Sequence, residues 1–286
     1  MSIVVTGATG QLGRLVVAAL LERGVPAADV LATGRDADKL AGLESDGVRT
    51  RRVDLDDPAT LDGAFAAGDT VLLVSTDAVG QRVAQHTAAI EAAAEAGVAS
   101  VVYTSAPHAD TSGLVLAPEH KATEEVLRAS GVPFTVLRNN WYTENYLPQV
   151  EQARATGALV ASAADGRVAS ATRRDFAEGA AVVLTTDGHE GRTYELSGDV
   201  AWSFDDLADV LGDLTGRAVV YRPVSSEEHQ RILVQAGLDE GTAGFVATLD
   251  ANIARGDLAD ATSDLRDLIG RPTTTLRDGL TEAAAG

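Results

Sequence analysis

The chain contains no cysteine, and this absence excludes several kinds of chemistry at once. Without thiols it forms no disulfide bond, offers no thiolate nucleophile and holds no cysteine-ligated metal. Its five histidines lack the spacing of metal ligands. A Gly-x-Ser-x-Gly elbow, the usual site of a hydrolase serine, is also missing. We therefore expect no metal and no hydrolase of the usual kind.

Positive charge is scarce as well. Lys and Arg together number 23 against 42 Asp and Glu, which gives a net charge of -19 over 286 residues. Nucleic-acid binders need a basic surface to displace counterions, so we expect no nucleic-acid partner. No apolar run approaches the roughly 18 residues that span a bilayer, and no basic-then-apolar leader opens the chain. The sequence thus predicts a cytoplasmic protein with no membrane partner.

What the chain does contain is a glycine-rich loop, TGATGQLG over residues 6–13, directly after an apolar run. In a dinucleotide-binding loop Gly7 permits a tight turn, and Gly10 lets the backbone approach a pyrophosphate. Gly13 lets the following helix lie close to the strand. Apolar residues at helical spacing over 12–20 predict that helix. The loop therefore has the sequence context of a dinucleotide site.

Apolar runs and helical patterns alternate over the first half of the chain. This βαβ alternation predicts an α/β fold, a Rossmann-type doubly wound parallel sheet with right-handed crossovers. After residue 139 the alternation becomes irregular, so we assign 1–138 to an NAD(P)-binding domain. Residues 139–286 are assigned to a smaller mixed C-terminal domain on the substrate side, interwoven with the first. The predicted strands of the first domain are 3–5, 30–33, 51–53, 71–74, 101–105 and 134–137.

The residue that follows the second predicted strand indicates which nucleotide binds. An acidic residue there selects NAD by bonding the ribose 2′-hydroxyl, whereas a 2′-phosphate calls for a cation. Here Gly34 is followed by Arg35, whose guanidinium binds phosphate in a bidentate manner, so NADP(H) is favoured. The neighbouring Asp36 weakens the local positive field and leaves a solvated surface arginine as the alternative. Asp54-Leu55 and Ser75-Thr76 follow the next two strands and are predicted to border adenine and ribose.

The proton chemistry of ordinary short-chain dehydrogenases is missing. They pair a Tyr with a Lys four residues later, and none of the five tyrosines here has that partner. The acceptor should therefore be easily reduced, as a quinone is, with solvent supplying the proton. His120-Lys121 is the one cationic pair predicted near the carboxyl side of the sheet. Lys121 is thus a candidate catalytic residue, with a surface helix lysine as the alternative.

Several stretches together resemble one family. They are TGATGQLG (6–13), VGQR (79–82), YTS with HADTS (103–105 and 108–112), RNNWYTENY (138–146) and ASATR (169–173). With these motifs the chain resembles the type 2 NAD(P)H quinone oxidoreductases. That family lies in the NmrA-like, atypical branch of the short-chain dehydrogenases, close to the triphenylmethane reductases. The resemblance covers essentially the whole length.

The resemblance implies NADPH bound without flavin and direct hydride transfer to a quinone. It places the segment 139–144 at the nicotinamide end, where Trp141 and Tyr142 would stack on a flat acceptor. An aromatic seam between domains is the alternative for both, and Tyr142 is a further candidate catalytic residue. Together with the residue-level reasoning, the predicted cofactor site comprises Thr6, Gly7, Ala8, Thr9, Gly10, Gln11, Leu12, Gly13, Arg35, Asp54, Leu55, Ser75, Thr76, Asp77, Asn139, Asn140, Trp141, Tyr142, Thr143 and Glu144.

Three alternatives stay open. Asn140 stands where a glycine is common in the family, and its side chain would narrow the pocket or add a hydrogen bond. Reduction of triphenylmethane or azo dyes would use the same site with another acceptor. A non-enzymatic NADP(H) sensor, like the NmrA regulators, would bind the nucleotide and signal to a protein. Dimers and tetramers are common in this fold, which leaves a homo-oligomer open, but no segment identifies an interface.

Overall fold

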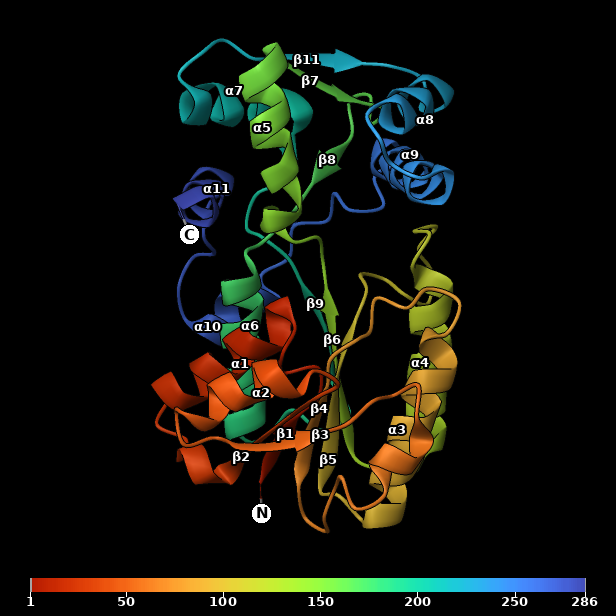
Figure 1. Ribbon diagram of the computed structural model, residues 1–286, viewed down its shortest axis with the longest axis vertical. Helices are drawn as coiled ribbons and strands as arrows, with labels where there is room; N and C mark the ends of the chain where they lie inside the picture. The colour runs from red at the N-terminus through yellow and green to blue at the C-terminus, as the bar shows by residue number, and fades with distance from the viewer. Residues whose placement is uncertain (1, 286) are drawn as a thin grey trace.

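A seven-stranded sheet forms the lower half of the molecule in Figure 1, which shows a computed structural model that describes residues 2–285. All neighbouring strands pair in parallel, in the order β3-β2-β1-β4-β5-β6-β9. This confirms the predicted Rossmann-type sheet. The strands are β1 (Ile3–Val5), β2 (Val30–Gly34), β3 (Arg49–Arg52), β4 (Thr70–Leu73), β5 (Ser100–Ser105), β6 (Phe134–Asn139) and β9 (Thr193–Leu196).

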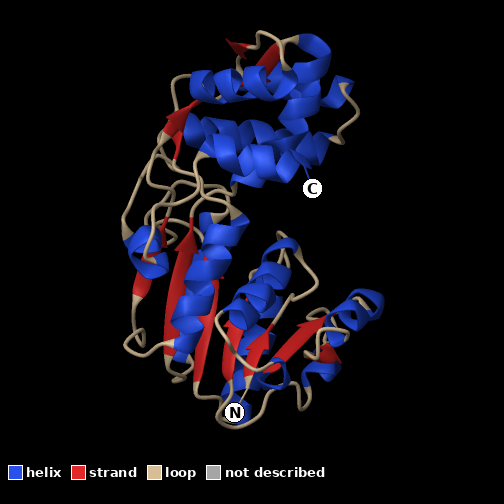
Figure 2. Ribbon diagram, turned by 90° about the vertical axis from the view of Figure 1, so that its left-hand side faces the viewer, coloured by secondary structure: helices blue, strands red, loops and turns tan. Residues whose placement is uncertain are grey.

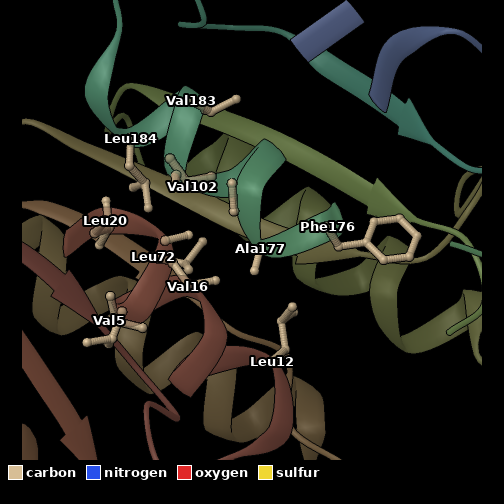
Figure 3. Close-up of a cluster of buried hydrophobic side chains, with 14 of the residues drawn as sticks. Val5, Leu12, Val16, Leu20, Leu72, Val102, Phe176, Ala177, Val183 and Leu184 are labelled. Atoms are coloured by element: carbon tan, nitrogen blue, oxygen red, sulfur yellow. The ribbon is translucent and has the colours of Figure 1, made fainter. Parts of the chain in front are cut away.

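Helices cover both faces of the sheet, because its strands are apolar on both sides. On one face α1 (Gln11–Glu22) packs against α6 (Arg173–Thr185), with α2 (Ala37–Glu44) and α10 (Asp264–Ile269) beside them (Figure 1). On the other face lie α3 (Arg82–Ala96) and α4 (Ala117–Ala129). Figure 3 shows the first interface, where side chains of α1 and α6 meet those of β1, β4 and β5.

A second, mostly helical part lies above the sheet in Figure 2. Its core centres on aromatic contacts, among them Tyr146 against Trp202 with ring centroids 4.9 Å apart. Two small sheets, β7 with β11 and β8 with β10, complete it. The elements are α5 (Leu147–Thr156), β7 (Ala158–Ala161), β8 (Arg167–Val168), β10 (Trp202–Ser203), α7 (Phe204–Thr215), β11 (Val220–Pro223), α8 (Ser226–Gln235), α9 (Glu240–Ala254) and α11 (Leu276–Ala285).

The chain passes between the two parts more than once. It leaves the large sheet after β6, builds α5, β7 and β8 in the upper part, and returns with α6 and β9. The last strand of the Rossmann sheet and two of its covering helices, α6 and α10, therefore come from residues after 139. The proposed division into 1–138 and 139–286 marks the first exit from the sheet. Within residues 2–285, no helix is both long and apolar enough to cross a membrane.

Candidate nucleotide and substrate site

The glycine loop has the geometry that a dinucleotide site requires. Gly7 adopts a φ of +59°, which favours glycine, and the Gly10 N–H donates to the Gly7 carbonyl at 2.9 Å. A Cβ on Gly13 would lie 2.3 Å from the Gly7 oxygen, so only glycine lets α1 start this close to the turn. Gly10 is the N-cap of α1, and because glycine has no side chain it makes no side-chain hydrogen bond to the first turn of the helix. The free N–H groups of the first turn are thus available to an anion.

A cavity of about 480 Å³ opens beside this loop, at the carboxyl ends of the strands. Ligands of open α/β sheets bind at this position, where the strand order reverses between β1 and β4. All but four of the predicted cofactor residues line it. Those that line it are Gly7, Thr9, Gly10, Gln11, Leu12, Gly13, Arg35, Asp54, Leu55, Ser75, Thr76, Asp77, Asn139, Asn140, Trp141 and Tyr142.

Arg35 lies exposed at the end of the cavity nearest β2. The neighbouring Asp36 is engaged with Lys39, because its carboxylate accepts the Lys39 N–H at 3.1 Å and lies 3.5 Å from the Lys39 amine. That backbone hydrogen bond lowers the pKa of Asp36. On the neighbouring loop Asp54 lies 3.6 Å from the Arg52 guanidinium. Each of these two carboxylates thus has a cation other than Arg35 beside it.

Three buried polar atoms on the cavity wall have no hydrogen-bond partner among residues 2–285. They are the hydroxyl of Thr76, the carbonyl oxygen of Gln85 and the carbonyl oxygen of Asn139. Unpaired buried polar atoms are costly, and a ligand that carries hydroxyl and amide groups would satisfy them. Together with the glycine turn and Arg35, they fit a nicotinamide dinucleotide in size, charge and hydrogen bonding.

At β5 and β6 the cavity wall becomes mostly apolar. We call this part the apolar end; it is lined by Ala106, Pro107, Leu114, Leu116, His120 and Trp141. His120 is 5% exposed, and its Nδ1 lies 2.8 Å from the Tyr103 hydroxyl. Burial lowers the pKa of His120 to about 3, with Arg82 and His86 lowering it further. His120 is thus neutral, and the prediction of a cationic His120-Lys121 pair is wrong because burial disfavours the charge.

Neither candidate catalytic residue is placed in a typical acid–base arrangement. Lys121 is exposed on α4 and lies outside the cavity lining. Tyr142 lines the cavity, with the Arg173 guanidinium 4.6 Å above its ring and Phe176 edge-on at 5.4 Å. Burial raises the pKa of Tyr142, which favours the protonated phenol. The roles of Tyr142 and Lys121 in catalysis stay proposals.

Four predicted cofactor residues support the cavity wall without lining it. The Thr6 hydroxyl accepts the Val74 N–H at 3.0 Å, which ties the glycine loop to the segment after β4. Ala8 is fully buried beneath that loop. The Thr143 hydroxyl bonds Ser170, and Glu144 accepts the Arg173 N–H at 2.8 Å. These residues position their neighbours, so we keep them out of the proposed direct contacts.

Asn140 makes two hydrogen bonds within the protein. Its carbonyl oxygen accepts the Trp141 N–H at 2.6 Å, and its amide donates to the Leu258 carbonyl at 3.4 Å. The side chain thereby links the end of β6 to the chain after α9. Of the two effects predicted for Asn140, the structure contains the added hydrogen bonds.

Sequence reasoning missed part of the lining. Gln85 and Arg82 come from α3, which carries no phosphate-loop signal, and Arg173 starts α6 after residue 139. The only signal for Arg173 was its place in the ASATR stretch. The remaining missed residues are Gly34, Val53, Asp56, Val74, Ala78, Ser105, Ala106, Pro107, Leu114 and Leu116.

Comparisons with known proteins agree with this site. A family described as NAD(P)H-binding matches residues 7–187. Quinone oxidoreductase 2 of Escherichia coli is 43% identical over 278 residues, 97% of each chain. The chain belongs to the quinone oxidoreductase 2 group of NmrA-like, atypical short-chain dehydrogenases/reductases. This confirms the family resemblance and makes the protein an oxidoreductase that binds NAD(P)H.

Solved structures of this oxidoreductase group have the same fold. A crystal structure of E. coli NADPH-dependent quinone oxidoreductase complexed with NADPH matches with a TM-score of 0.94 at 43% identity, covering 98% of this chain and 99% of that one. Triphenylmethane reductase of Citrobacter sp. matches with a TM-score of 0.95 at 38% identity, covering all of both chains. The NAD(P)H azoreductase of Xenophilus azovorans is 30% identical over 96% of each chain.

Proposed function

We propose that this oxidoreductase reduces quinones with NADPH by direct hydride transfer, without a flavin. The single observation that carries the proposal is the shape of the cavity. One continuous space runs from Arg35, past the glycine turn, to the apolar end. It thus offers a charged end for a phosphorylated nucleotide and an apolar end for a flat acceptor. The similarity to the E. coli quinone reductase supports the same acceptor class.

Each part of the wall has a distinct task in this proposal. Gly10 and the first turn of α1 bind the pyrophosphate, and Arg35 binds the 2′-phosphate. The unpaired oxygens of Thr76 and Asn139 bind the ribose and the carboxamide on the nicotinamide half. When bound, the nicotinamide supplies the hydride. The apolar end holds the acceptor against it and keeps water from the contact, and Trp141 offers an aromatic face.

The experiment mixes purified protein with NADPH and a benzoquinone or naphthoquinone, with no added flavin. We expect loss of the nicotinamide absorbance at a rate proportional to protein concentration. With stereospecifically deuterated NADPH, one of the two labels should slow the reaction, as direct hydride transfer requires. Nucleotides released by denaturation are then identified. Absence of turnover contradicts the proposed activity, and co-purified flavin contradicts the mechanism.

Dye reduction is a second candidate, because the triphenylmethane reductase and the azoreductase match over nearly the whole chain. The two candidates share the nucleotide site and differ at the apolar end. A panel of quinones, triphenylmethane cations and azo compounds, compared by kcat/KM at fixed NADPH, separates them. A sensor would bind NADP+ and NADPH alike and reduce none of these acceptors.

A further inference from the structure

We propose that His120 is a catalytic residue that donates a hydrogen bond from Nε2 to the oxygen of the acceptor, and that Tyr103 is the positioning residue that fixes its tautomer. The inference rests on the proposed quinone reduction and adds a residue to it. His120 lies in the first turns of α4 (Ala117–Ala129) and is 5% exposed, yet it lines the cavity. Its aliphatic neighbours there, such as Leu114 and Leu116, offer an acceptor no side-chain hydrogen bond.

The tautomer of His120 follows from the surroundings of Tyr103. The Tyr103 hydroxyl is fully buried and lies 2.8 Å from His120 Nδ1. Thr123 also forms a side-chain hydrogen bond with Tyr103, and we assign the Tyr103 O–H as the donor to its 2.8 Å neighbour, Nδ1 of His120. A neutral imidazole that accepts at Nδ1 carries its proton on Nε2. The remaining N–H of His120 is therefore the one that is free to meet a ligand.

The residues behind Tyr103 hold this arrangement in place. The ring of His86 packs edge-on against Tyr103, with centroids 5.4 Å apart. His86 is itself fixed at both nitrogens, because Nε2 accepts the Thr76 N–H at 3.2 Å and Nδ1 lies 3.1 Å from the Thr123 hydroxyl. Burial raises the pKa of Tyr103 and keeps its hydroxyl protonated. The donor to His120 Nδ1 is thus a neutral, immobilised phenol.

Polar side chains beside the apolar end are engaged within the protein. The Ser105 hydroxyl donates to Glu124 at 2.7 Å, and Asn140 uses both its amide oxygen and its amide nitrogen within the protein. Trp141 and its neighbour Tyr142 also line the cavity, and they carry an indole N–H and a hydroxyl. Tyr142 is the rival for the proposed role, because its hydroxyl is an acid as well as a hydrogen-bond donor.

The chemistry assigns His120 a hydrogen-bonding role and no net proton transfer. The quinone gains two electrons and one proton together as hydride from the nicotinamide, which leaves NADP+ and a hydroquinone monoanion. The second proton comes from water. Because burial lowers the pKa of His120 to about 3, the neutral ring persists at pH 7. Its fixed N–H stabilises the negative charge that forms on the acceptor oxygen, as oxyanion-hole donors do.

The kinetic test compares His120→Leu, which removes the donor, with His120→Gln, which keeps an N–H near the position of Nε2. We expect kcat/KM for a quinone to fall about 100-fold in the leucine variant and to recover by about tenfold in the glutamine variant. Glu125→Ala, an exposed residue on α4, should stay within about twofold of wild type. NADPH affinity, measured by fluorescence titration, should be unchanged in all three variants. Tyr142→Phe is measured beside them as the test of the rival donor.

A second readout needs no turnover. Nitrogen-15 NMR of histidine in the free protein should give the signature of a neutral ring protonated at Nε2 for His120. Tyr103→Phe should change that signature, because Nδ1 loses its donor. A ring protonated at Nδ1, or a leucine variant that equals wild type, overturns the role of His120. Loss of activity in Tyr142→Phe alone transfers the role to Tyr142. If wild-type protein reduces no quinone, the proposed function fails first, and this inference fails with it.

Discussion

At the scale of single residues, we propose that Arg35 decides which nucleotide the site prefers. Its guanidinium is exposed at the cavity edge, and Asp36 is held by Lys39 and the start of α2. We expect Arg35→Ala to raise the dissociation constant for NADPH about tenfold or more, the size of one lost hydrogen bond to a charged group. The dissociation constant for NADH should stay within about twofold of its wild-type value. Calorimetric titration of the protein with each nucleotide measures both.

Lys39→Ala is the matched control for that measurement. It removes the same charge from the same surface, but Lys39 lies outside the cavity lining and pairs with Asp36. Exposed ion pairs contribute little, so NADPH affinity should change by less than about twofold. An equal loss of NADPH affinity in Arg35→Ala and Lys39→Ala would mean that only the overall positive charge of this surface matters. Unchanged discrimination in Arg35→Ala would remove the role assigned to that residue.

At the scale of elements, the start of α1 depends on one glycine. A Cβ at Gly13 would meet the Gly7 oxygen at 2.3 Å and the Ala8 Cα at 2.8 Å, both backbone atoms that cannot swing away. Gly13→Ala should therefore push α1 from the turn, at a cost of about 1–3 kcal/mol in the free energy of unfolding. NADPH binding should weaken in parallel. Urea unfolding and nucleotide titration measure the two effects.

For Gly42→Ala, in helix α2, we expect the free energy of unfolding to change in the opposite direction. Nothing lies within 4 Å of a Cβ at this position in α2, and its φ is not in the left-handed region. Alanine should stabilise the protein there by up to about 1 kcal/mol, because it loses less backbone entropy on folding. If Gly13→Ala and Gly42→Ala had the same free energy of unfolding, the short distance between Gly13 and the Gly7 turn would not constrain the position of α1.

Elements with a strong local signal were predictable, and elements that depend on distant partners were not. The apolar run of β1 and the helical spacing of α1 can each be recognised within a few residues of sequence. By contrast β9 is four residues, TYEL, and becomes the seventh strand only because α6 brings the chain back to β6. Helix α8 begins at Ser226, where Ser225 caps a polar first turn that has no apolar periodicity to predict it.

At the scale of the whole molecule, the site was predictable where it follows strand ends. Arg35 comes directly after β2, and Ser75 follows β4 with Val74 between them, so their convergence follows from a parallel sheet. The apolar end draws on α4 and on the loops after β5 and β6, whose packing only the folded chain defines. His120 was noted as a cation in the sequence. Its neutrality results from burial against Tyr103, which no local pattern records.

Buried histidines also make the stability of the whole molecule depend on pH. Burial lowers the pKa of both His86 and His120 to about 3, while an unfolded histidine titrates near 6.5. Between these values the unfolded chain binds more protons, so the free energy of unfolding falls as pH drops below 6.5. Each histidine contributes a slope of up to about 1.4 kcal/mol per pH unit.

The window from pH 6.5 to 4.5 separates the histidines from carboxylates such as Glu124, whose pKa is lowered by Arg138 and Ser105 against the opposing effect of burial. Burial also lowers the pKa of His189, so only the difference between wild type and a His120 variant reports on His120. Urea unfolding at pH 7, 6 and 5 should show the loss for the wild type, and His120→Gln should lose less by up to about 1.4 kcal/mol per unit. If the free energy of unfolding fell with pH equally steeply in wild type and His120→Gln, His120 would not be held neutral in the folded protein. Glutamine is always neutral, so His120→Gln mimics His120 in the kinetic test only if His120 is itself neutral. The pH dependence of stability therefore tests an assumption of the kinetic experiment.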